Sequence, residues 1–398
     1  MKPTSQLPLL LITEHFAPGH GATAQLMTDL ACGLVSRGIP VTVLTATASN
    51  QNSYSELPNK LKVIRIAVKW GESKKVFNKI IKGVLFLVGA LVWGILYGSR
   101  GQQIFIASNP PFIGLLGLLL KLRGMSYVFI FQDLFPRSAV LSGVLPAVGP
   151  ITSFWRFVMA CICFNSKYTV VLTDAMSRRL SIDFGRRPNL VSIHNWAVER
   201  AMPLLRTENI FISEMGLSDF FIVQYSGNFG RLHDLLTLLE AARLLENAPI
   251  RFLFIGDGSK NNQISSYSDE FGLSNLIKLP YQKRERLPDT LGACDISVIG
   301  LIPGAEDTVA PCKFYGILAS GRPVLLIARL NCDLAQLVIK ENIGVVVEPG
   351  EAYELAEALR NLQLDPKRIL AMGQRASFLY ESRFGRERSI NSYAALLE

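Results

Sequence analysis

The stretch LPLLLITEHFAPGHGATAQLMTDLACGLVSRGIPVTVLT, residues 7–45, contains a complete strand–helix–strand unit. The apolar run Leu7–Thr13 predicts a β-strand, and after a glycine-containing loop the apolar residues of 24–37 recur at helical spacing. Gly38 predicts the end of that helix, and Val41–Thr45 predicts a second strand. Near-continuous apolar strands separated by helices are typical of a parallel sheet covered on both faces.

The same alternation recurs along the chain. Further strands are predicted at residues 104–108, 127–133, 168–174, 191–196, 220–227, 250–258, 277–280, 294–300, 323–328 and 343–349. A polar stretch without a predicted element, residues 197–218, interrupts the series and places a boundary near residue 200. We therefore expect an α/β protein with two Rossmann-like, doubly wound parallel-sheet domains, residues 1–200 and 201–375. A last helix within residues 376–398 is free to pack back on the first domain.

Composition limits the class of protein. The chain has 398 residues, a hydrophobic fraction of 49% and a net charge of +9, which excludes a disordered chain and points to anionic partners. These include nucleic acid, anionic lipid and phosphorylated small molecules. The six cysteines are dispersed among apolar residues and predict reduced core side chains. The amino terminus lacks the long apolar region and cleavage site of a secretion signal, so we expect a cytoplasmic protein.

Residues 60–98 differ from the rest of the chain. Between Lys60 and Lys82 there are eight Lys/Arg residues against one acid, Glu72, and the next fifteen residues, 84–98, carry no charge. That run is shorter than the roughly 20 residues of a bilayer span. A basic stretch that precedes an apolar helix favours the interface of an anionic membrane. The alternative is a buried core helix that follows a solvated charged loop. Two more apolar runs, 110–124 and 150–164, favour the membrane interpretation.

Two loops in the second half carry the residues of a ligand site, because ligands of open α/β sheets bind outside the carboxyl ends of the strands. In YSGNFGRLHD, Gly227 and Gly230 allow a phosphate or sugar to approach the backbone, and Arg231 can pair with phosphate oxygens. Such a glycine turn with a surface arginine also arises by chance. In IGDGSK, Asp257 can accept a ribose hydroxyl or form an Asx turn.

A third loop, GAEDTVAPCKFYGILASGRPVL, residues 304–325, places Pro311 before a predicted helix and Lys313 at its start. The helix dipole favours acids there, so a lysine is best explained by an anion such as a diphosphate, held together with the helix N–H groups. Gly316 lies inside the helix, where glycine costs about 1 kcal/mol relative to alanine.

These segments, in this order, resemble the carboxyl half of family 4 retaining glycosyltransferases of the GT-B fold. The likeness is strongest to the branch that builds bacterial O-antigen and capsular or exopolysaccharide sugars on lipid carriers. In the first half ITEHFAPGHGATAQLMTDLACGLVSRGIPVTVLT, FQDLFPRSAVLSG and VSIHNWA are similar to the same branch. The resemblance covers nearly the whole chain and implies two domains that face each other across a cleft.

The resemblance implies roles for individual residues. Arg231 and Lys313 would bind the donor diphosphate, and Asp133 would lie on the acceptor side unless it is only an N-cap for the segment that follows. The positions expected to line the nucleotide sugar are Gly19, Gly21, Gly227, Gly230, Asp257, Gly258, Tyr281, Gln282, Lys283, Asp307 and Pro311.

The chain departs from the family pattern at three positions. Family members commonly carry two glutamates eight residues apart, and Thr308 and Gly316 stand at the matching positions. We expect Glu306, the nearest acid, to contact sugar hydroxyls instead, with Asp307 beside it. A lysine usual in the first loop is replaced by Leu236, which leaves Lys313 as the more important cation.

The implied activity is transfer of a sugar from a nucleotide diphosphate donor, with retention of configuration, to a lipid-carried saccharide or polyprenyl-phosphate acceptor. UDP is expected by analogy, and the missing side chain at Gly316 suggests an N-acetylated amino or deoxy sugar. The sequence has no Asp-x-Asp and only four scattered histidines, so no metal cofactor is expected. We expect the protein to bind no nucleic acid and to be peripheral on the inner face of the cell membrane. The alternatives are a sugar-nucleotide epimerase on the same fold and a non-catalytic sugar-nucleotide-binding scaffold.

Overall fold

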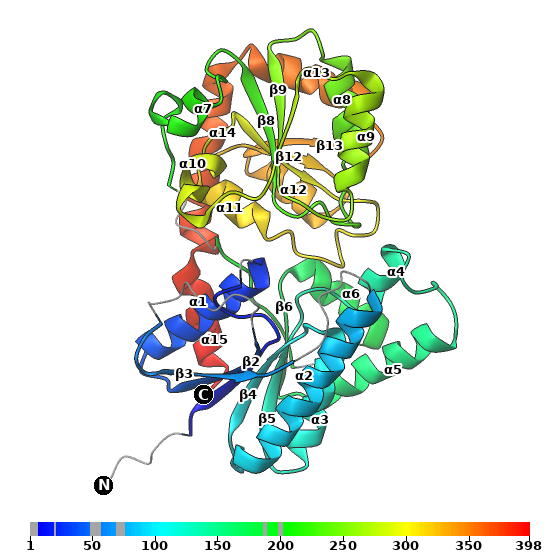
Figure 1. Ribbon diagram of the computed structural model, residues 1–398, viewed down its shortest axis with the longest axis vertical. Coiled ribbons are helices and arrows are strands. Elements are labelled where there is room, and N and C mark those ends of the chain that lie inside the picture. The colour runs from blue at the N-terminus through cyan, green and yellow to red at the C-terminus, as the bar shows by residue number, and fades with distance from the viewer. Residues whose placement is uncertain (1–6, 20, 48–56, 69–75, 186–188, 198–201) are drawn as a thin grey trace. The chain divides into compact units, whose positions relative to one another are not determined.

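The chain folds into two compact units, each built on its own parallel sheet. The computed structural model describes residues 7–19, 21–47, 57–68, 76–185, 189–197 and 202–398 (Figure 1). Unit 1 comprises Met1–Val198 with Glu387–Glu398, and unit 2 comprises Glu199–Arg386. The predicted fold class, two doubly wound parallel sheets with helices on their faces, is confirmed.

The sheet of unit 1 has seven described strands in the order β3-β2-β1-β4-β5-β6-β7, all parallel to their neighbours. The strands are β1 Leu9–Ile12, β2 Val41–Ala46, β3 Leu61–Ile66, β4 Gln103–Ala107, β5 Ser126–Ile130, β6 Tyr168–Val171 and β7 Leu190–Ser192. The helices are α1 Ala22–Ser36, α2 Val76–Tyr97, the 3-10 helix η1 Pro111–Gly114, α3 Leu115–Lys121, α4 Arg137–Leu141, α5 Pro150–Asn165, α6 Asp174–Phe184 and α15 Arg386–Ala395.

The opening strand–helix–strand unit follows from the sequence pattern. All four residues of β1 are buried, and Leu10 pairs with Thr42 of β2 on one side and Ile104 of β4 on the other. This central position explains the continuous apolar run. Helix α1 ends before Gly38, whose φ of 81° is accessible to glycine with little strain.

One strand was missed from the sequence, and it corrects the interpretation of the basic stretch. Residues 61–66, LKVIRI, form the edge strand β3, where lysine and arginine are tolerated because such charges discourage pairing with another chain. Lys62 and Arg65 therefore belong to the sheet. Arg65 points inward, and its Nη2 donates to the backbone oxygen of Ala17 at 2.6 Å. Lys69, Lys74 and Lys75 lie outside the described residues, as does the side chain of Lys79.

Helix α2 is not the core helix that the sequence left as an alternative. Only 22% of its most apolar window, Ile80–Tyr97, is buried, although the mean hydropathy of that window is 2.1. This segment is also the one described helix that is long and apolar enough to span a membrane.

The C-terminal helix α15 packs within unit 1. Arg37, the C-cap of α1, forms a 2.5 Å ion pair with Glu387, and Gly33 leaves room for the side chain of Ile390. Trp196 and Tyr393 are buried with their ring centroids 6.4 Å apart. The chain thus returns to unit 1 after Arg386, beyond the predicted limit of residue 375 for the second domain.

The sheet of unit 2 has six described strands in the order β10-β9-β8-β11-β12-β13, again all parallel. The strands are β8 Phe221–Ser226, β9 Ile250–Ile255, β10 Leu276–Leu279, β11 Ile296–Gly300, β12 Val324–Ile327 and β13 Gly344–Val347. The helices are η2 Arg206–Glu208, α7 Ile210–Glu214, α8 Leu236–Leu244, α9 Asn261–Phe271, η3 Arg284–Arg286, α10 Leu287–Leu291, α11 Lys313–Ala319, α12 Asp333–Lys340, α13 Ala352–Gln363, α14 Pro366–Leu379 and the π-helix η4 Tyr380–Phe384.

The stretch 197–218, predicted to have no regular structure, contains the short helices η2 and α7. Asn209 caps α7, since its side-chain oxygen accepts a hydrogen bond from the amide of Ile212. Phe211, Ile212 and Leu217 are buried in a cluster that includes residues of β8 and β9. With 3 and 5 residues, η2 and α7 are too short to show a helical period in the sequence.

Candidate functional site

The loops after β8 and β9 are joined into one backbone surface at the carboxyl edge of the unit 2 sheet. The amide of Gly227 donates to Ile255 at 2.8 Å, and the amide of Phe229 donates to Asp257 at 2.9 Å. A Cβ atom at Gly258 would lie 2.5 Å from the backbone oxygen of Phe229. Gly258 is therefore required for close packing of the two loops, a sufficient reason for glycine whether or not a nucleotide approaches it.

Lys313 reaches this surface from the start of α11. A Cβ atom on Gly227, whose φ is 117°, would lie 3.9 Å from Cε of Lys313. The Lys313 Nζ lies 3.4 Å from the ring centroid of Tyr225, in cation–π geometry. This nitrogen is enclosed and has no hydrogen-bond partner among the residues that the structure describes. Burial lowers the pKa of Lys313 well below its ordinary value, because a charged amine loses its hydration there.

Tyr225 links Lys313 to the loop that carries Arg231. The Tyr225 hydroxyl lies 2.7 Å from Nδ1 of His233, and the amide of Gly230 donates to the same nitrogen at 3.1 Å. Burial, reinforced by the nearby Lys313, lowers the pKa of His233 to about 3. The imidazole is thus neutral at physiological pH, and its Nδ1 also lies 2.9 Å from the backbone oxygen of Asn228.

Arg231 is exposed and makes no hydrogen bond or ion pair with another described side chain, so its guanidinium is available to a ligand. The position of Leu236, where the family usually has a lysine, is at the start of α8. A different cation meets the same loop: Lys260 Nζ donates to the backbone oxygen of His233 at 2.7 Å. Three cations therefore surround one glycine loop. Arg231 directly follows Gly230 in sequence, Lys260 donates to the backbone of His233, and Lys313 lies beside Gly227.

The residues predicted to line the nucleotide lie at the next loops. Asp257 is exposed, and its Oδ1 accepts from the amide of the next residue, Gly258, at 2.8 Å, whereas an Asx turn would need the amide two residues on. The hydroxyl of Tyr281, after β10, donates to the backbone oxygen of Asp257 at 3.3 Å. Gln282 turns back to the oxygen of Pro280, and Lys283 is exposed. The structure thus brings Tyr281 to Asp257, whereas the Gln282 side chain is directed to Pro280 instead.

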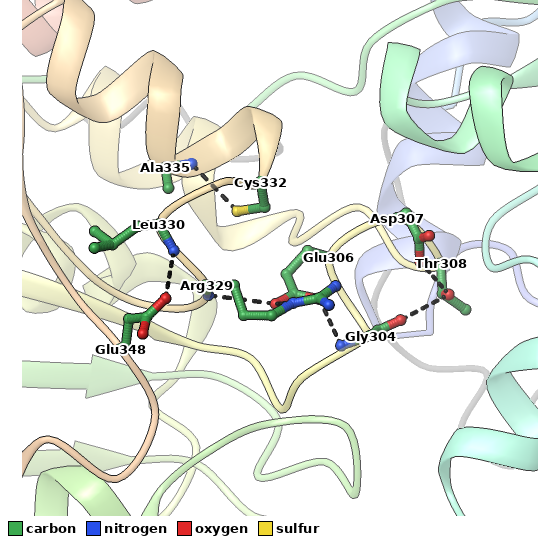
Figure 2. A network of polar contacts seen from close by, with 9 residues as sticks. All are labelled: Gly304, Glu306, Asp307, Thr308, Arg329, Leu330, Cys332, Ala335 and Glu348. Atoms are coloured by element: carbon green, nitrogen blue, oxygen red, sulfur yellow. Dashed lines mark hydrogen bonds and ion pairs between the residues drawn. The ribbon is translucent and has the colours of Figure 1, made fainter.

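Glu306 is held within its own loop. Figure 2 shows its carboxylate between Arg329, which follows β12, and the backbone of Gly304. Arg329 Nε and Nη2 both donate to it at 3.0 Å, and the Gly304 amide donates at 2.7 Å. The Glu306 side chain is only 2% exposed, against 45% for Arg329. In this arrangement the carboxylate braces the loop after β11, and contact with a sugar hydroxyl stays a prediction.

The other residues of this loop surround the start of α11. Thr308, at one of the two missing glutamate positions, is buried, and its hydroxyl lies within hydrogen-bonding distance of Asp307 Oδ1 at 3.0 Å and of the backbone oxygen of Gly304 at 3.1 Å. The backbone oxygen of Pro311 accepts from Phe314 at 2.9 Å. Helix α11 has only seven residues and Cys312 as its N-cap. Its dipole is correspondingly short, so the Lys313 charge outweighs the helix as an anion ligand.

Gly316 has open space beside it. No heavy atom lies within 4 Å of a Cβ built on this residue. Close packing against a neighbouring loop therefore does not explain the glycine. The missing side chain leaves room next to the turn that begins with Lys313.

Three of the predicted site residues, Gly19, Gly21 and Asp133, belong to unit 1. Gly19 makes a tight turn, since its Cβ would lie 3.0 Å from the oxygen of Phe16, whereas Gly21 has no atom within 4 Å and is the N-cap of α1. Asp133 is exposed after β5, and α4 begins with Pro136 as its N-cap and without a side-chain cap. The alternative role of Asp133 as a cap for that helix is thus not realised.

The two halves of the chain each match a family model. Residues 21–196 match the glycosyl transferase 4-like domain, and residues 208–377 match glycosyl transferases group 1. The chain is a family 4 glycosyltransferase. It is thereby an enzyme, which sets aside the non-catalytic scaffold, and a transferase, which disfavours the epimerase.

Relatives and solved structures agree with this assignment. This glycosyltransferase is 25% identical over 291 residues to the Pseudomonas aeruginosa protein named "Probable glycosyltransferase WbjE", covering 71% of this chain and 72% of that protein. It is 33% identical over 147 residues to WcaI of Escherichia coli K12, which is named for colanic acid biosynthesis, covering 37% and 36% of the two chains. The chain thus belongs to the glycosyltransferases of bacterial polysaccharide biosynthesis.

The fold is that of known GT-B enzymes. Sucrose-phosphate synthase from Thermosynechococcus elongatus superposes with a TM-score of 0.79 at 18% identity over 98% of both chains. Anabaena HepE, solved in complex with UDP-glucose, superposes with a TM-score of 0.74 at 13% identity over 98% of this chain and 99% of HepE.

Tyr225, His233, Lys260 and Arg329 were not chosen from the sequence. Arg329 directly follows β12, so the rule that ligands bind beyond strand carboxyl ends could have identified it. Tyr225 and His233 could not be identified in this way. The sequence around Tyr225 predicts only a buried strand, and His233 is one of several polar residues in its loop. The described residues contain no group of three or more His, Cys, Asp or Glu side chains that could hold a metal ion. Metal independence stays a prediction.

Proposed function

We propose that this glycosyltransferase moves a sugar from a UDP-linked donor to a lipid-carried saccharide or polyprenyl-phosphate acceptor, with retention of anomeric configuration. The observation that carries the donor part is the Lys313 ammonium, enclosed beside Gly227 and stacked on Tyr225 without a hydrogen-bonding partner among the described residues. A buried cation is costly unless it is paired, and a diphosphate supplies the missing anion.

Arg231 would bind the other side of the diphosphate. Its exposed guanidinium follows the Gly227–Gly230 loop, and planar guanidinium groups form paired hydrogen bonds with phosphate oxygens. Lys260, held on the backbone of the same loop, adds positive charge where Leu236 cannot. As the donor bond breaks, negative charge accumulates on the diphosphate, and these fixed cations would stabilise it without moving.

UDP is supported by HepE, a neighbour in fold that was solved with UDP-glucose, and by the Tyr281–Asp257 pair at the next loop, which a base and ribose could contact. The relative WcaI, named for colanic acid biosynthesis, supports a saccharide acceptor, and the lipid carrier is proposed from the family resemblance. We further propose that the protein works on the cytoplasmic side of the membrane and needs no metal. The reaction then depends on Arg231, Lys260 and Lys313 for charge stabilisation.

The test is a transfer assay with a panel of UDP- and GDP-sugars and a polyprenyl-diphosphate-linked sugar acceptor, with and without a chelator. We expect one UDP-sugar to label the lipid fraction and the anomeric configuration of the product to match the donor. Release of label only with GDP-sugars would refute the UDP assignment. Loss of activity with the chelator, restored by a divalent cation, would refute metal independence. Conversion of the free nucleotide sugar without lipid labelling would instead identify an epimerase.

A further inference from the structure

Helix α2 exposes an apolar face along its described length. Phe86 and Ala90 are fully buried on its inner side. The opposite side carries large apolar residues spaced four apart, each 45% to 67% exposed: Ile80, Val84, Val88, Val92 and Leu96. Residues at this spacing share one face of a helix, so water meets a continuous apolar stripe.

Helix α5 extends this apolar surface. Figure 1 shows α2, α3 and α5 side by side, and α3 packs against both of the others. On α5, Phe154, Phe157 and Phe164 are 58%, 68% and 69% exposed, and Leu122 after α3 is 85% exposed. The α2–α5 face consists of these four residues together with the five exposed residues of α2, Ile80, Val84, Val88, Val92 and Leu96. Contiguous apolar patches of this kind on soluble proteins mark interaction surfaces.

The charge of the chain identifies the partner. Residues 73–173 contain ten Lys/Arg and a single acid, Asp133, of the 41 basic and 32 acidic residues in the chain. The other residues therefore carry 31 of each sign, so the whole net charge of +9 lies in the segment that forms the α2–α5 face. A surface that combines exposed apolar side chains with an excess of cations matches an anionic lipid bilayer.

The cations lie at the ends of the helices and beside the aromatic residues. Lys121 Nζ donates to the backbone oxygen of Asn165, the last residue of α5, at 3.0 Å. Arg123 donates to the backbone oxygen of Ile95 near the end of α2. On α5, the exposed Arg156 lies in sequence between Phe154 and Phe157. Long basic side chains beside aromatic rings can reach phosphate groups while the rings enter the acyl boundary.

We propose that the α2–α5 face docks on an anionic bilayer with α2 lying in the plane of the interface. A spanning arrangement is disfavoured because Phe86 and Ala90 are packed inside unit 1, which would have to release them. Docking rests on the proposed function in one respect: the lipid-carried acceptor that we propose would be anchored in the same bilayer. The occupant is therefore a membrane rather than a second protein.

The test is flotation of the full-length protein with vesicles of phosphatidylcholine alone or with 30% phosphatidylglycerol. We expect binding only to the anionic vesicles and weakening with salt. The triple variant Leu122→Ser/Phe154→Ser/Phe157→Ser should bind at least about tenfold more weakly, because it removes the side chains that enter the bilayer. The matched control is Leu364→Ser/Leu370→Ser/Phe378→Ser in unit 2, whose side chains are 78%, 61% and 73% exposed and which should bind like the wild type.

Equal vesicle binding by the two triple variants would overturn the proposal. So would a dimer in light scattering that only the α2–α5 variant abolishes, together with no vesicle binding, because the face would then be a protein interface. Transfer to a water-soluble acceptor analogue separates this proposal from the function itself. Vesicle binding without transfer contradicts the function, and transfer without vesicle binding contradicts only the docking face.

Discussion

Two cations of unit 2 occupy comparable places but have opposite surroundings. Lys313 follows the loop after β11, and Arg329 follows the neighbouring strand β12. Arg329 is 45% exposed and forms two hydrogen bonds to Glu306, which raises its pKa. The Lys313 Nζ is enclosed, rests on the ring of Tyr225, and has no anionic partner among the described residues.

The different surroundings indicate different roles: Arg329 is a structural cation, whereas Lys313 is suited to bind an anionic ligand. Arg329 and Glu306 satisfy each other, and the pair fixes the loop that leads to α11 (Figure 2). Lys313 is left in an unfavourable state by the protein alone, since burying a charge without a partner costs free energy. Sites that break a local rule in this way are commonly functional. An anion that binds to the Lys313 ammonium would recover this free energy.

Among the substitutions that test this comparison, Lys313→Met should have the largest effect on activity. Loss of one preorganised charged donor should lower kcat/KM by about 10²- to 10³-fold. Because an unpaired buried charge is removed, the variant should also unfold at a higher temperature, with a gain of about 1 kcal/mol. Steady-state kinetics and thermal unfolding without nucleotide measure the two effects.

Lys367→Met is the matched control, since Lys367 is exposed on α14, is not among the predicted nucleotide-sugar residues, and should change neither quantity strongly. Near-normal activity of Lys313→Met would remove the lysine from diphosphate binding. A large loss of stability would show that the stacked cation is structural, like Arg329.

The converse experiment is Arg329→Met. It leaves the Glu306 carboxylate, 2% exposed, without its partner, and breaking a buried pair from one side costs about 3 kcal/mol. Because Arg329 is partly exposed, water can replace some of its contacts, and we expect a loss of about 2 kcal/mol. Chemical denaturation measures the free energy of unfolding.

The double variant Glu306→Gln/Arg329→Met tests the reason for that loss. With the carboxylate removed as well, most of the stability should return, and donor KM should stay close to that of the wild type. If the double variant instead loses turnover while remaining folded, Glu306 contacts the sugar as the sequence predicted.

The sequence predicted the sheets and the binding loops better than it predicted the partners of each side chain. Twelve predicted runs each overlap an observed strand, because buried parallel strands need continuous apolar residues. Strand β3 was missed because an edge strand is not so constrained. Gly227 and Lys313, 86 positions apart in sequence, were chosen for one ligand and lie together.

Side-chain pairing was harder to predict, because it depends on distances between loops. Glu306 was selected as the acid nearest to the missing glutamates, yet Arg329, 23 residues later, holds it. Tyr225, whose ring contacts Lys313, lies within an apolar strand pattern, and nothing in the sequence pattern predicts that contact. Arg65 was counted with membrane-facing charges, but the strand that contains it directs it to the backbone of Ala17.

A finer test of the comparison uses pH. Burial lowers the pKa of Lys313 in the free protein, and a bound diphosphate should raise it. Between these two pKa values, UDP binding must take up a proton, so UDP affinity should fall by up to about tenfold per pH unit as the pH rises. Calorimetry at one pH in buffers with different ionisation enthalpies measures the proton uptake. Lys313→Met should show none, and an equal uptake in both proteins would place the proton elsewhere.

Stability should have its own dependence on pH. A lysine with a lowered folded-state pKa binds fewer protons in the folded than in the unfolded protein, so stability rises with pH between the lowered value and the ordinary pKa of about 10.4. The stability advantage of Lys313→Met over the wild type should therefore shrink across that window. A constant difference would mean that the lysine is not desolvated in solution.

The smallest expected change comes from Gly316→Glu, which would make Lys313 resemble Arg329. Residues three apart share a helix face, so the new carboxylate can pair with the lysine one turn earlier. The open space at Gly316 and the gain in helix propensity should raise stability by about 0.5 to 1 kcal/mol. The pair should also compete with the diphosphate and fill the room that we assign to a bulky donor sugar. Gly316→Ala is the control, because it restores propensity without charge. A donor screen measures the outcome: equal use of all donors by both variants would mean that Gly316 does not determine which sugar is transferred.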